Sequence, residues 1–338
     1  RAKATRHAEV MKILSEQNYR EEMQKTVEPY LNKLRQTADF KSFDGKPIHA
    51  VKYILEKPSG VVVISHGFTE SQEKYHEMIY YFLKSGYNVW ALDHRGHGNS
   101  FRKAADHTVS HVDDFSEYVR DFEVFVNENV KPQSGQLPLC LYAHSMGGAV
   151  GILYLEQHPD VFKAAVLTAP MVAPKTHGVP VFLGKMICRL AIKLHKDTDR
   201  VFFFKEFAVP EPYDKGASSS HARYEYYANM RAKNQHLQNN APSYSWTLQS
   251  LCVKKQILKD NDPKKIKTPM ILFSADMDDY VLESAQKAFC NLSGCEFIKV
   301  HGTKHEIYGA ENPVVKPYLE KILSFYEAHC GRQGVHAR

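Results

Sequence analysis

Short, continuous apolar runs recur along the chain and predict strands that are buried on both faces. Six such runs, rich in β-branched residues, lie at residues 61–65, 88–93, 139–142, 164–168, 270–274 and 297–300. Between them, apolar residues recur at spacings of three and four, which predicts helices at residues 75–85, 112–130, 149–158 and 282–290. Strands that alternate with helices in this way are typical of a mostly parallel, doubly wound α/β sheet.

The first part of the chain follows a different pattern. Residues 1–36 are charged, and their apolar residues, from Val10 to Leu34, recur at helical spacing, so we expect a helical N-terminal arm over residues 1–37. The dipeptide Asp44-Gly45 is typical of a tight hairpin turn. It predicts a strand over residues 49–55 that starts the sheet in the antiparallel sense.

The alternation of strand and helix stops between about Met171 and Lys265. This stretch is rich in Lys, Tyr, Phe and His and has helical periods, but it contains no run typical of a buried strand. Because a structureless loop of this length is uncommon in a compact domain, we expect a helical cap at residues 171–265, inserted over the strand ends where ligands bind in such sheets. The α/β core then comprises residues 38–170 and 266–330.

The composition constrains the size of the core, the charge of possible partners and the state of the cysteines. The chain has 338 residues, of which 43% are apolar, enough for a large core. Its net charge of +6 is mild and suits an anionic membrane surface about as well as nucleic acid; we expect no nucleic-acid partner. The six cysteines lack C-x-x-C spacing, and we expect reduced, buried thiols and no metal site.

Neither a membrane-spanning run nor a signal-peptide pattern is visible, which predicts a cytoplasmic protein. Peripheral contact with a membrane is compatible with this, and a leader removed ahead of Arg1 stays open.

A candidate nucleophile lies where a predicted strand turns into a predicted helix. Residues 139–142 lead through Ala143-His144 into Ser145-Met146-Gly147-Gly148. This is the layout of a nucleophile elbow, in which a sharp turn requires small neighbours and exposes the serine hydroxyl above the sheet. Ala143 takes the place of the usual first glycine.

The residues that such a serine requires follow in the expected order. Serine acyl transfer needs a base and an acid that orients the base, and in this fold both follow late strands. His305 follows the last predicted strand, and Asp276, Asp278 and Asp279 follow the preceding one. We favour Asp278 because it lies three residues before Val281, where the next helix begins to pack; Asp276 is the second candidate and Asp279 the third.

Two backbone N–H groups are expected to form the oxyanion hole. In such folds they belong to the residue after the nucleophile and to a loop after an earlier strand, here Met146 and Phe68. For His66 we favour a hydrogen bond that braces this loop. His94 and His97 are three residues apart, but no further ligand completes a metal site.

Several of these motifs, in the same order, resemble the lysophospholipase and monoacylglycerol lipase family of α/β-hydrolases, and bacterial lysophospholipases of the inner membrane in particular. The likeness covers roughly residues 38–328 and is carried by His66-Gly67-Phe68, Asp93 to Ser100, Asp114-Phe115 with Tyr118 and Asp121, Ala143 to Gly148, Thr168 to Met171, and Gly302 with His305-Glu306. Ala143 fits the bacterial members, whereas Ala275 and Met277 depart from the family's usual approach to the acid, which keeps Asp276 as an alternative.

The resemblance implies an α/β-hydrolase fold and a serine hydrolase that cleaves the carboxylic ester of a lipid with one acyl chain, without a cofactor. It implies Ser145 as nucleophile, Asp278 as acid, His305 as base, and Phe68 and Met146 as oxyanion donors. A small-substrate esterase or peptidase of the same fold is the alternative, and a non-catalytic binding module is a third hypothesis.

The predicted cap contains a basic amphipathic helix at residues 181–196. Its apolar positions include Phe182, Met186 and Leu190, and another face carries Lys185, Arg189, Lys193 and Lys196. Such a helix can lie in the headgroup layer of an anionic membrane and cover an acyl chain, or it can pack its apolar face on the body of the protein. We expect Phe182, Met186, Leu190 and Phe203 to bind the lipid substrate.

Overall fold

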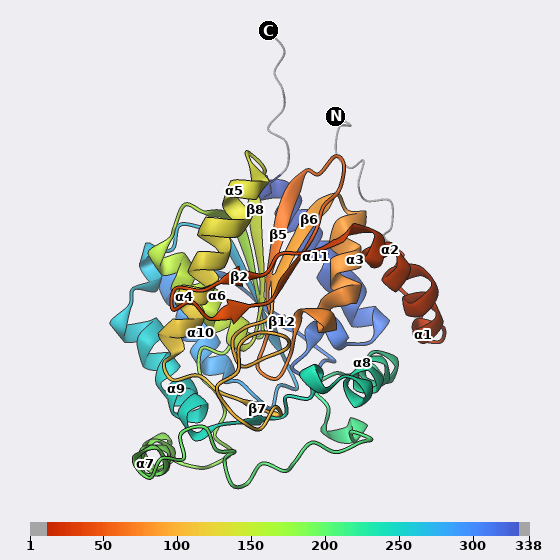
Figure 1. The fold of residues 1–338 in the computed structure, drawn as a ribbon. Helices are drawn as coiled ribbons and strands as arrows, with labels where there is room; N and C mark the ends of the chain where they lie inside the picture. The colour runs from red at the N-terminus through yellow and green to blue at the C-terminus, as the bar shows by residue number, and fades with distance from the viewer. Residues whose placement is uncertain (1–11, 331–338) are drawn as a thin grey trace.

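The computed structural model describes residues 12–330 and contains a central sheet of eight strands (Figure 1). From β6 onward the neighbouring strands are parallel, whereas β1 and β4 pair antiparallel at one edge. In their order across the sheet, the strands are β1 (Arg35–Thr37), β4 (Ala50–Tyr53), β6 (Tyr87–Leu92), β5 (Gly60–Ser65), β8 (Leu139–His144), β9 (Phe162–Thr168), β11 (Met270–Ala275) and β12 (Glu296–Val300). The six predicted strands are all present.

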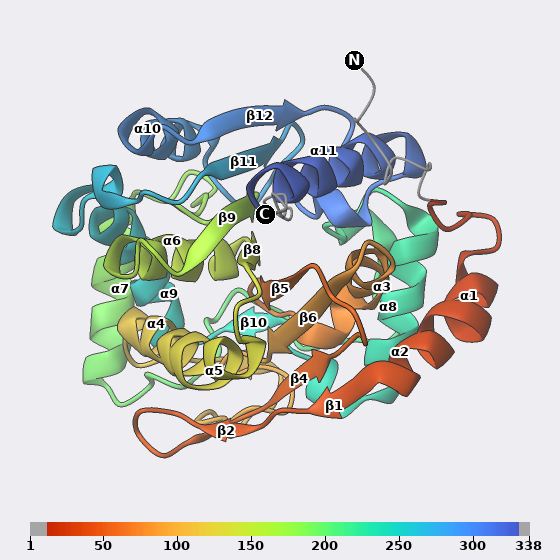
Figure 2. The ribbon, with the colours of Figure 1, turned by 90° about the horizontal axis from the view of Figure 1, so that it is seen from above.

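Two apolar clusters, one on each face, enclose the sheet. In β5, Val61 and Val63 belong to one cluster, and Val62 and Ile64 to the other, because successive side chains point to opposite faces. Figure 2 shows the two sets of helices on either side of the sheet. One set comprises α4 (Phe115–Val124), η3 (Phe125–Val130), α5 (Lys131–Ser134), α6 (Met146–Gln157) and α10 (Glu283–Ser293); the other comprises η2 (Gln72–Tyr75), α3 (His76–Lys84), η8 (Ile307–Gly309) and α11 (Asn312–Cys330).

The helical arm is shorter than predicted. Helical segments run from Tyr19 to Leu34 as α1 (Tyr19–Glu22), η1 (Met23–Val27) and α2 (Glu28–Leu34), but the predicted residues 35–37 form β1. Pairing of β1 with β4 extends the sheet and ends the helix there. Val10, with residues 1–11, lies outside the described residues.

The predicted hairpin is present in a small form. β2 (Phe40–Lys41) pairs with β3 (Pro47–Ile48), and Gly45 has φ +77°, a left-handed conformation that favours glycine.

Residues between β9 and β11 cover the carboxyl ends of the parallel strands, at the bottom of Figure 1. A two-residue strand within them, β10, pairs with β7 and adds a contact that the sequence pattern did not predict. The elements are α7 (Val181–Lys193), η4 (Tyr213–Lys215), α8 (His221–Lys233), η5 (Gln235–Leu237), β10 (Ala241–Pro242), α9 (Tyr244–Lys255), η6 (Gln256–Asp260) and η7 (Pro263–Lys265), with β7 at Val109–Ser110.

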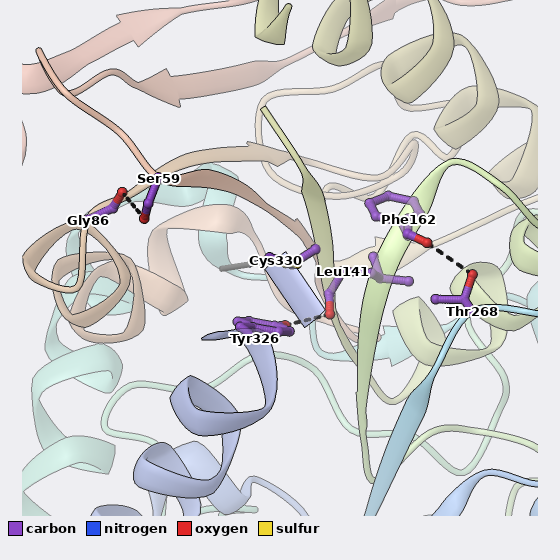
Figure 3. Close-up of a disulfide and its surroundings, with 8 residues drawn as sticks. Ser59, Gly86, Leu141, Phe162, Thr268, Tyr326 and Cys330 are labelled. Carbon is purple, nitrogen blue, oxygen red and sulfur yellow. Dashed lines mark hydrogen bonds between the residues drawn. A yellow bond between two sulfur atoms is a disulfide. The ribbon is translucent and has the colours of Figure 1, made fainter. Parts of the chain in front are cut away.

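One cysteine pair bears on the prediction of reduced, buried thiols. The sulfur atoms of Cys140 in β8 and Cys330 at the end of α11 lie in contact, with Cα atoms 7.4 Å apart, a separation beyond the range that a relaxed disulfide spans (Figure 3). One turn earlier in α11, the Tyr326 hydroxyl donates a hydrogen bond of 2.6 Å to the Leu141 carbonyl. The two cysteines are 190 residues apart in the sequence, so no local spacing pattern predicted that they would meet. The remaining described cysteines are free thiols.

Candidate active site

Ser145 occupies a sharp turn between β8 and α6. Its φ of +52° and ψ of −117° are strained for a residue with a side chain, and its N–H is fixed by the Thr168 carbonyl at 3.1 Å. A Cβ on Gly147 would lie 2.3 Å from the Ser65 carbonyl oxygen, and one on Gly148 would lie 2.6 Å from a proline side chain. The two glycines are therefore required for the turn, as the sequence motif predicted.

Ser145, His305 and Asp278 come together at the carboxyl ends of β8, β12 and β11. His305 Nε2 lies 2.8 Å from Ser145 Oγ, and His305 Nδ1 lies 2.7 Å from Asp278 Oδ2. All three side chains are buried. This chain of hydrogen bonds is the geometry in which a histidine accepts the proton of a serine while a carboxylate fixes the histidine tautomer.

Asp278 is held in its charged form by several donors. Its Oδ1 accepts N–H groups from Tyr280 at 2.8 Å and from Val281 at 3.1 Å. Burial alone would raise the pKa of Asp278, but the hydrogen bond and charge of His305, with these two N–H groups, outweigh it and lower the pKa below the usual value. A charged Asp278 can stabilise a positive charge on His305.

The other two candidate acids occupy different positions. Asp276 accepts N–H groups from Gly302 at 2.9 Å and from Thr303 at 3.1 Å, and thus braces the loop that carries His305. Asp279 is exposed. Of the three aspartates, only Asp278 is hydrogen-bonded to the histidine.

The two expected oxyanion donors lie at the start of α6 and in the loop after β5. Met146 is the first residue of α6, so its N–H has no partner within the helix. The Phe68 N–H has no hydrogen-bond acceptor within residues 12–330. His66 braces this loop: its Nδ1 bonds the Gly67 carbonyl at 2.7 Å and its Nε2 accepts the His94 N–H at 2.9 Å.

A buried polar cluster around Glu70, which was not predicted from the sequence, supports the loop after β5 from inside the protein. Glu70 accepts hydrogen bonds from the Gly67 N–H at 2.6 Å and from the Tyr75 and Tyr308 hydroxyls at 2.5 and 2.6 Å. Burial would raise the pKa of Glu70. The positive charge of Lys74 outweighs this effect, together with His144 and the hydrogen bonds from the two tyrosine hydroxyls, and the pKa of Glu70 lies well below its usual value. Glu306, the residue after His305, forms an ion pair with Lys74.

A cavity of about 1120 Å³ lies between Ser145 and the segments between β9 and β11. Much of its wall is apolar, including Phe68, Met171, Ile187, Cys188, Trp246 and Leu251. Its volume and lining suit a ligand with a long apolar chain.

Of the four predicted substrate-binding residues, only Phe203 lines this cavity. Phe182, Met186 and Leu190 are 73%, 56% and 58% exposed on the outer face of α7 and do not line the cavity, so a role in lipid binding for these three residues stays a prediction. Helical spacing identified the apolar face of α7, but it contained no information on which face packs inward.

Histidines and acids away from Ser145 have local partners. His94 Nε2 bonds Ser65 Oγ at 2.9 Å, and His97 Nδ1 bonds the Arg95 carbonyl at 3.0 Å. His111, Asp113 and Asp197 are close enough together to hold a metal ion. However, the Lys103 ammonium lies 2.6 Å from Asp113 and 3.6 Å from Asp197, and so supplies the positive charge there.

Comparison with known proteins shows the family to which the chain belongs. Residues 56–312 match the family described as serine aminopeptidase, S33. Lysophospholipase L2 of Escherichia coli K12 is 30% identical over 313 residues, which cover 89% of this chain and 90% of that protein. Human monoglyceride lipase is 34% identical over 125 residues, covering 37% of this chain and 39% of that protein.

Solved structures show the same fold. A soluble variant of monoglyceride lipase from Saccharomyces cerevisiae, in complex with a substrate analogue, has a TM-score of 0.71 at 17% identity and covers 88% of this chain and 96% of its own. A carboxyl esterase from Bacillus coagulans also has a TM-score of 0.71, at 19% identity, and covers 88% of this chain and 99% of its own. The chain therefore has the α/β-hydrolase fold and belongs to the serine aminopeptidase S33 family of hydrolases.

Proposed function

We propose that the chain hydrolyses the carboxylic ester of lipids with a single acyl chain, either lysophospholipids or monoacylglycerols, with Ser145 as nucleophile. The observation that carries the proposal is the hydrogen-bonded chain from Ser145 through His305 to Asp278 at the wall of a large, mainly apolar cavity. The names of the relatives, lysophospholipase and monoglyceride lipase, support the same substrate class.

The proposed reaction has two halves. In the first, His305 takes the proton of Ser145 Oγ as this oxygen attacks the ester carbonyl, and then gives the proton to the leaving alcohol. In the second, His305 takes a proton from water as the water oxygen attacks the acyl carbon, and it then gives this proton to Ser145 Oγ as the bond between Ser145 and the acyl group breaks and the fatty acid leaves. The negative oxygen in each tetrahedral intermediate is stabilised by the N–H groups of Phe68 and Met146.

The family description also suggests a peptidase, which shares this chemistry but needs a different binding site. A site for a free amino terminus needs a carboxylate to bind an ammonium group. Five of the glutamates that line the cavity lie within ion-pair distance of a basic side chain: Glu70, Glu73, Glu77, Glu211 and Glu306. Glu206 has no such partner within residues 12–330, but it is exposed. The apolar part of the wall favours an acyl chain instead.

The substrate class can be tested with esters of increasing acyl length and with aminoacyl p-nitroanilides. Burying one more methylene is worth about 0.8 kcal/mol, so kcat/KM should rise roughly two- to fourfold per added methylene until the cavity is filled. Ser145 should react with a fluorophosphonate probe. Equal kcat/KM for short and long chains, or faster cleavage of the anilides, would exclude a lipid site.

We also propose that α7 brings the active site to an anionic membrane surface. Phe182, Met186 and Leu190 present apolar side chains outward, and Arg189 and Lys193 are exposed beside them. A helix of this kind lies in the headgroup layer, with its apolar side chains among the acyl chains. None of the helices within residues 12–330 combines the length and apolar character that crossing a membrane requires.

A further inference from the structure

Most of the positively charged side chains that line the cavity are already neutralised. Lys74, Arg223 and Arg231 each form an ion pair with a carboxylate. The pairs, with their N–O distances, are Lys74 with Glu70 at 3.3 Å, Arg223 with Glu77 at 2.8 Å and Arg231 with Glu211 at 2.5 Å. Because a carboxylate balances the charge of each of these side chains, their attraction for an anionic ligand is weak.

Lys175 is different. It lines the cavity and is partly buried, yet no carboxylate within residues 12–330 forms an ion pair with it. Its ammonium group donates one hydrogen bond, to the backbone carbonyl of Asp278. Because an ammonium group has three donors, two remain for a ligand. Lys205 also lines the cavity and has no carboxylate partner in the described part of the chain, but it is exposed.

The backbone fixes Lys175 beside the reacting groups. Its N–H donates to the Tyr280 carbonyl at 2.8 Å, and the preceding residue, Pro174, bridges to Val281. The Tyr280 ring packs against the His305 ring, with centroids 5.0 Å apart. The ammonium group thus stands next to the loop that carries Asp278, and Lys175 lines the same cavity as Ser145 and His305.

We propose that Lys175 binds the phosphate of a lysophospholipid headgroup and gives the enzyme a preference for phosphate-bearing lipids over monoacylglycerols, an inference that rests on the proposed function. In a lysophospholipid the phosphate is joined to the cleaved ester by the glycerol backbone, so the two groups lie near each other. An unpaired, partly desolvated ammonium group attracts phosphate more strongly than an exposed one. A neutral glycerol headgroup gains nothing from this charge.

The test compares Lys175→Gln with wild type on two substrates that carry the same acyl chain, 1-palmitoylglycerol and 1-palmitoyl-glycero-3-phosphocholine, in neutral mixed micelles. Glutamine removes the charge and keeps an N–H donor, on a side chain that is one bond shorter than that of lysine. Because a hydrogen bond to a charged group is worth more than 1.4 kcal/mol, KM for the phospholipid should rise roughly tenfold, with kcat and both constants for the monoacylglycerol nearly unchanged. Lys175→Arg should keep most of the preference.

Lys163→Gln is the matched control, because this exposed lysine lies at the opposite end of β9 from the site. An equal loss of kcat on both substrates would overturn the inference and make Lys175 a positioning residue for the Asp278 loop. Unchanged kinetics on both substrates would overturn it as well. If wild type cleaves neither lipid but reacts with short esters, it is the proposed function that fails.

Discussion

The turn at Ser145 and the helix α7 are held in place in opposite ways. Ser145 is surrounded by buried groups whose positions are fixed by backbone contacts, and a single added methyl group on Gly147 would collide with the Ser65 carbonyl. The helix α7 buries only Cys188 and Ala191 and exposes a row of large apolar side chains. The proposed chemistry needs precise geometry at Ser145, whereas an exposed apolar face is typical of a surface that a membrane or a protein partner covers.

Replacing Ser145 by Ala should have the largest effect. Without the hydroxyl there is no acyl-enzyme, and kcat should fall by about 10⁶-fold, as in other serine hydrolases with a triad. Because alanine fits where serine fits, the thermal unfolding midpoint should change little, and binding to vesicles through α7 should persist. Residual activity within tenfold of wild type would mean that the precisely held turn is not the catalytic centre.

Replacing Asp278 by Asn should have the next largest effect. Asparagine removes the charge and favours the wrong tautomer of His305, so kcat should fall by about 10⁴-fold. Asp276→Asn is the matched control. It weakens two hydrogen bonds that brace the Gly302 loop and should lower kcat by no more than about tenfold. The opposite ranking would make Asp276 the acid.

Replacing Glu70 by Gln tests whether the buried cluster below Ser145 sets the geometry of the oxyanion loop. An amide keeps an acceptor for the Gly67 N–H but weakens the charge-assisted bonds from the Tyr75 and Tyr308 hydroxyls. Small displacements of catalytic groups cost up to about 10²-fold, so we expect kcat to fall by that order while KM stays nearly constant. The control variant is Glu128→Gln, which makes the same change at an exposed position. If Glu70→Gln keeps the kcat of wild type, the buried cluster contributes to the stability of the fold and not to the geometry of the oxyanion loop.

The sequence predicted the region around Ser145 better than α7 because local rules dominate there. A strand, a sharp turn and a helix require particular residues at fixed spacing, so Ser145, Gly147 and Gly148 could be recognised directly. The extent of α7 was also nearly right, since a period of 3.6 residues is local information. Its orientation is not local: Phe182 points outward because Cys188 and Ala191, on the opposite face, pack inward.

Contacts between distant segments were the least predictable. No local pattern marks Glu70, because its hydrogen-bond partner Tyr308 is 238 positions away in the chain. α11 was not among the predicted helices, and it carries Pro317, a residue that normally argues against a helix interior. Tertiary packing against the sheet outweighed this local signal, because Tyr318, Leu319 and Ile322 are buried there.

The smallest effect is expected from the outer face of α7. Neutralising Arg189 and Lys193 together should weaken binding to anionic vesicles by about 2 kcal/mol, roughly 30-fold, because each basic residue near such a surface contributes about 1 kcal/mol. The double variant Lys131→Gln/Lys163→Gln removes the same charge from exposed positions outside α7 and should bind as wild type does, and hydrolysis of a water-soluble short ester should be unchanged in both. Sedimentation with vesicles at low and high salt measures the difference, since screening weakens an electrostatic contribution. If both double variants bind equally, the exposed face of α7 does not contact the membrane through its charges, and a second copy of the chain becomes the better candidate for covering Phe182 and Leu190.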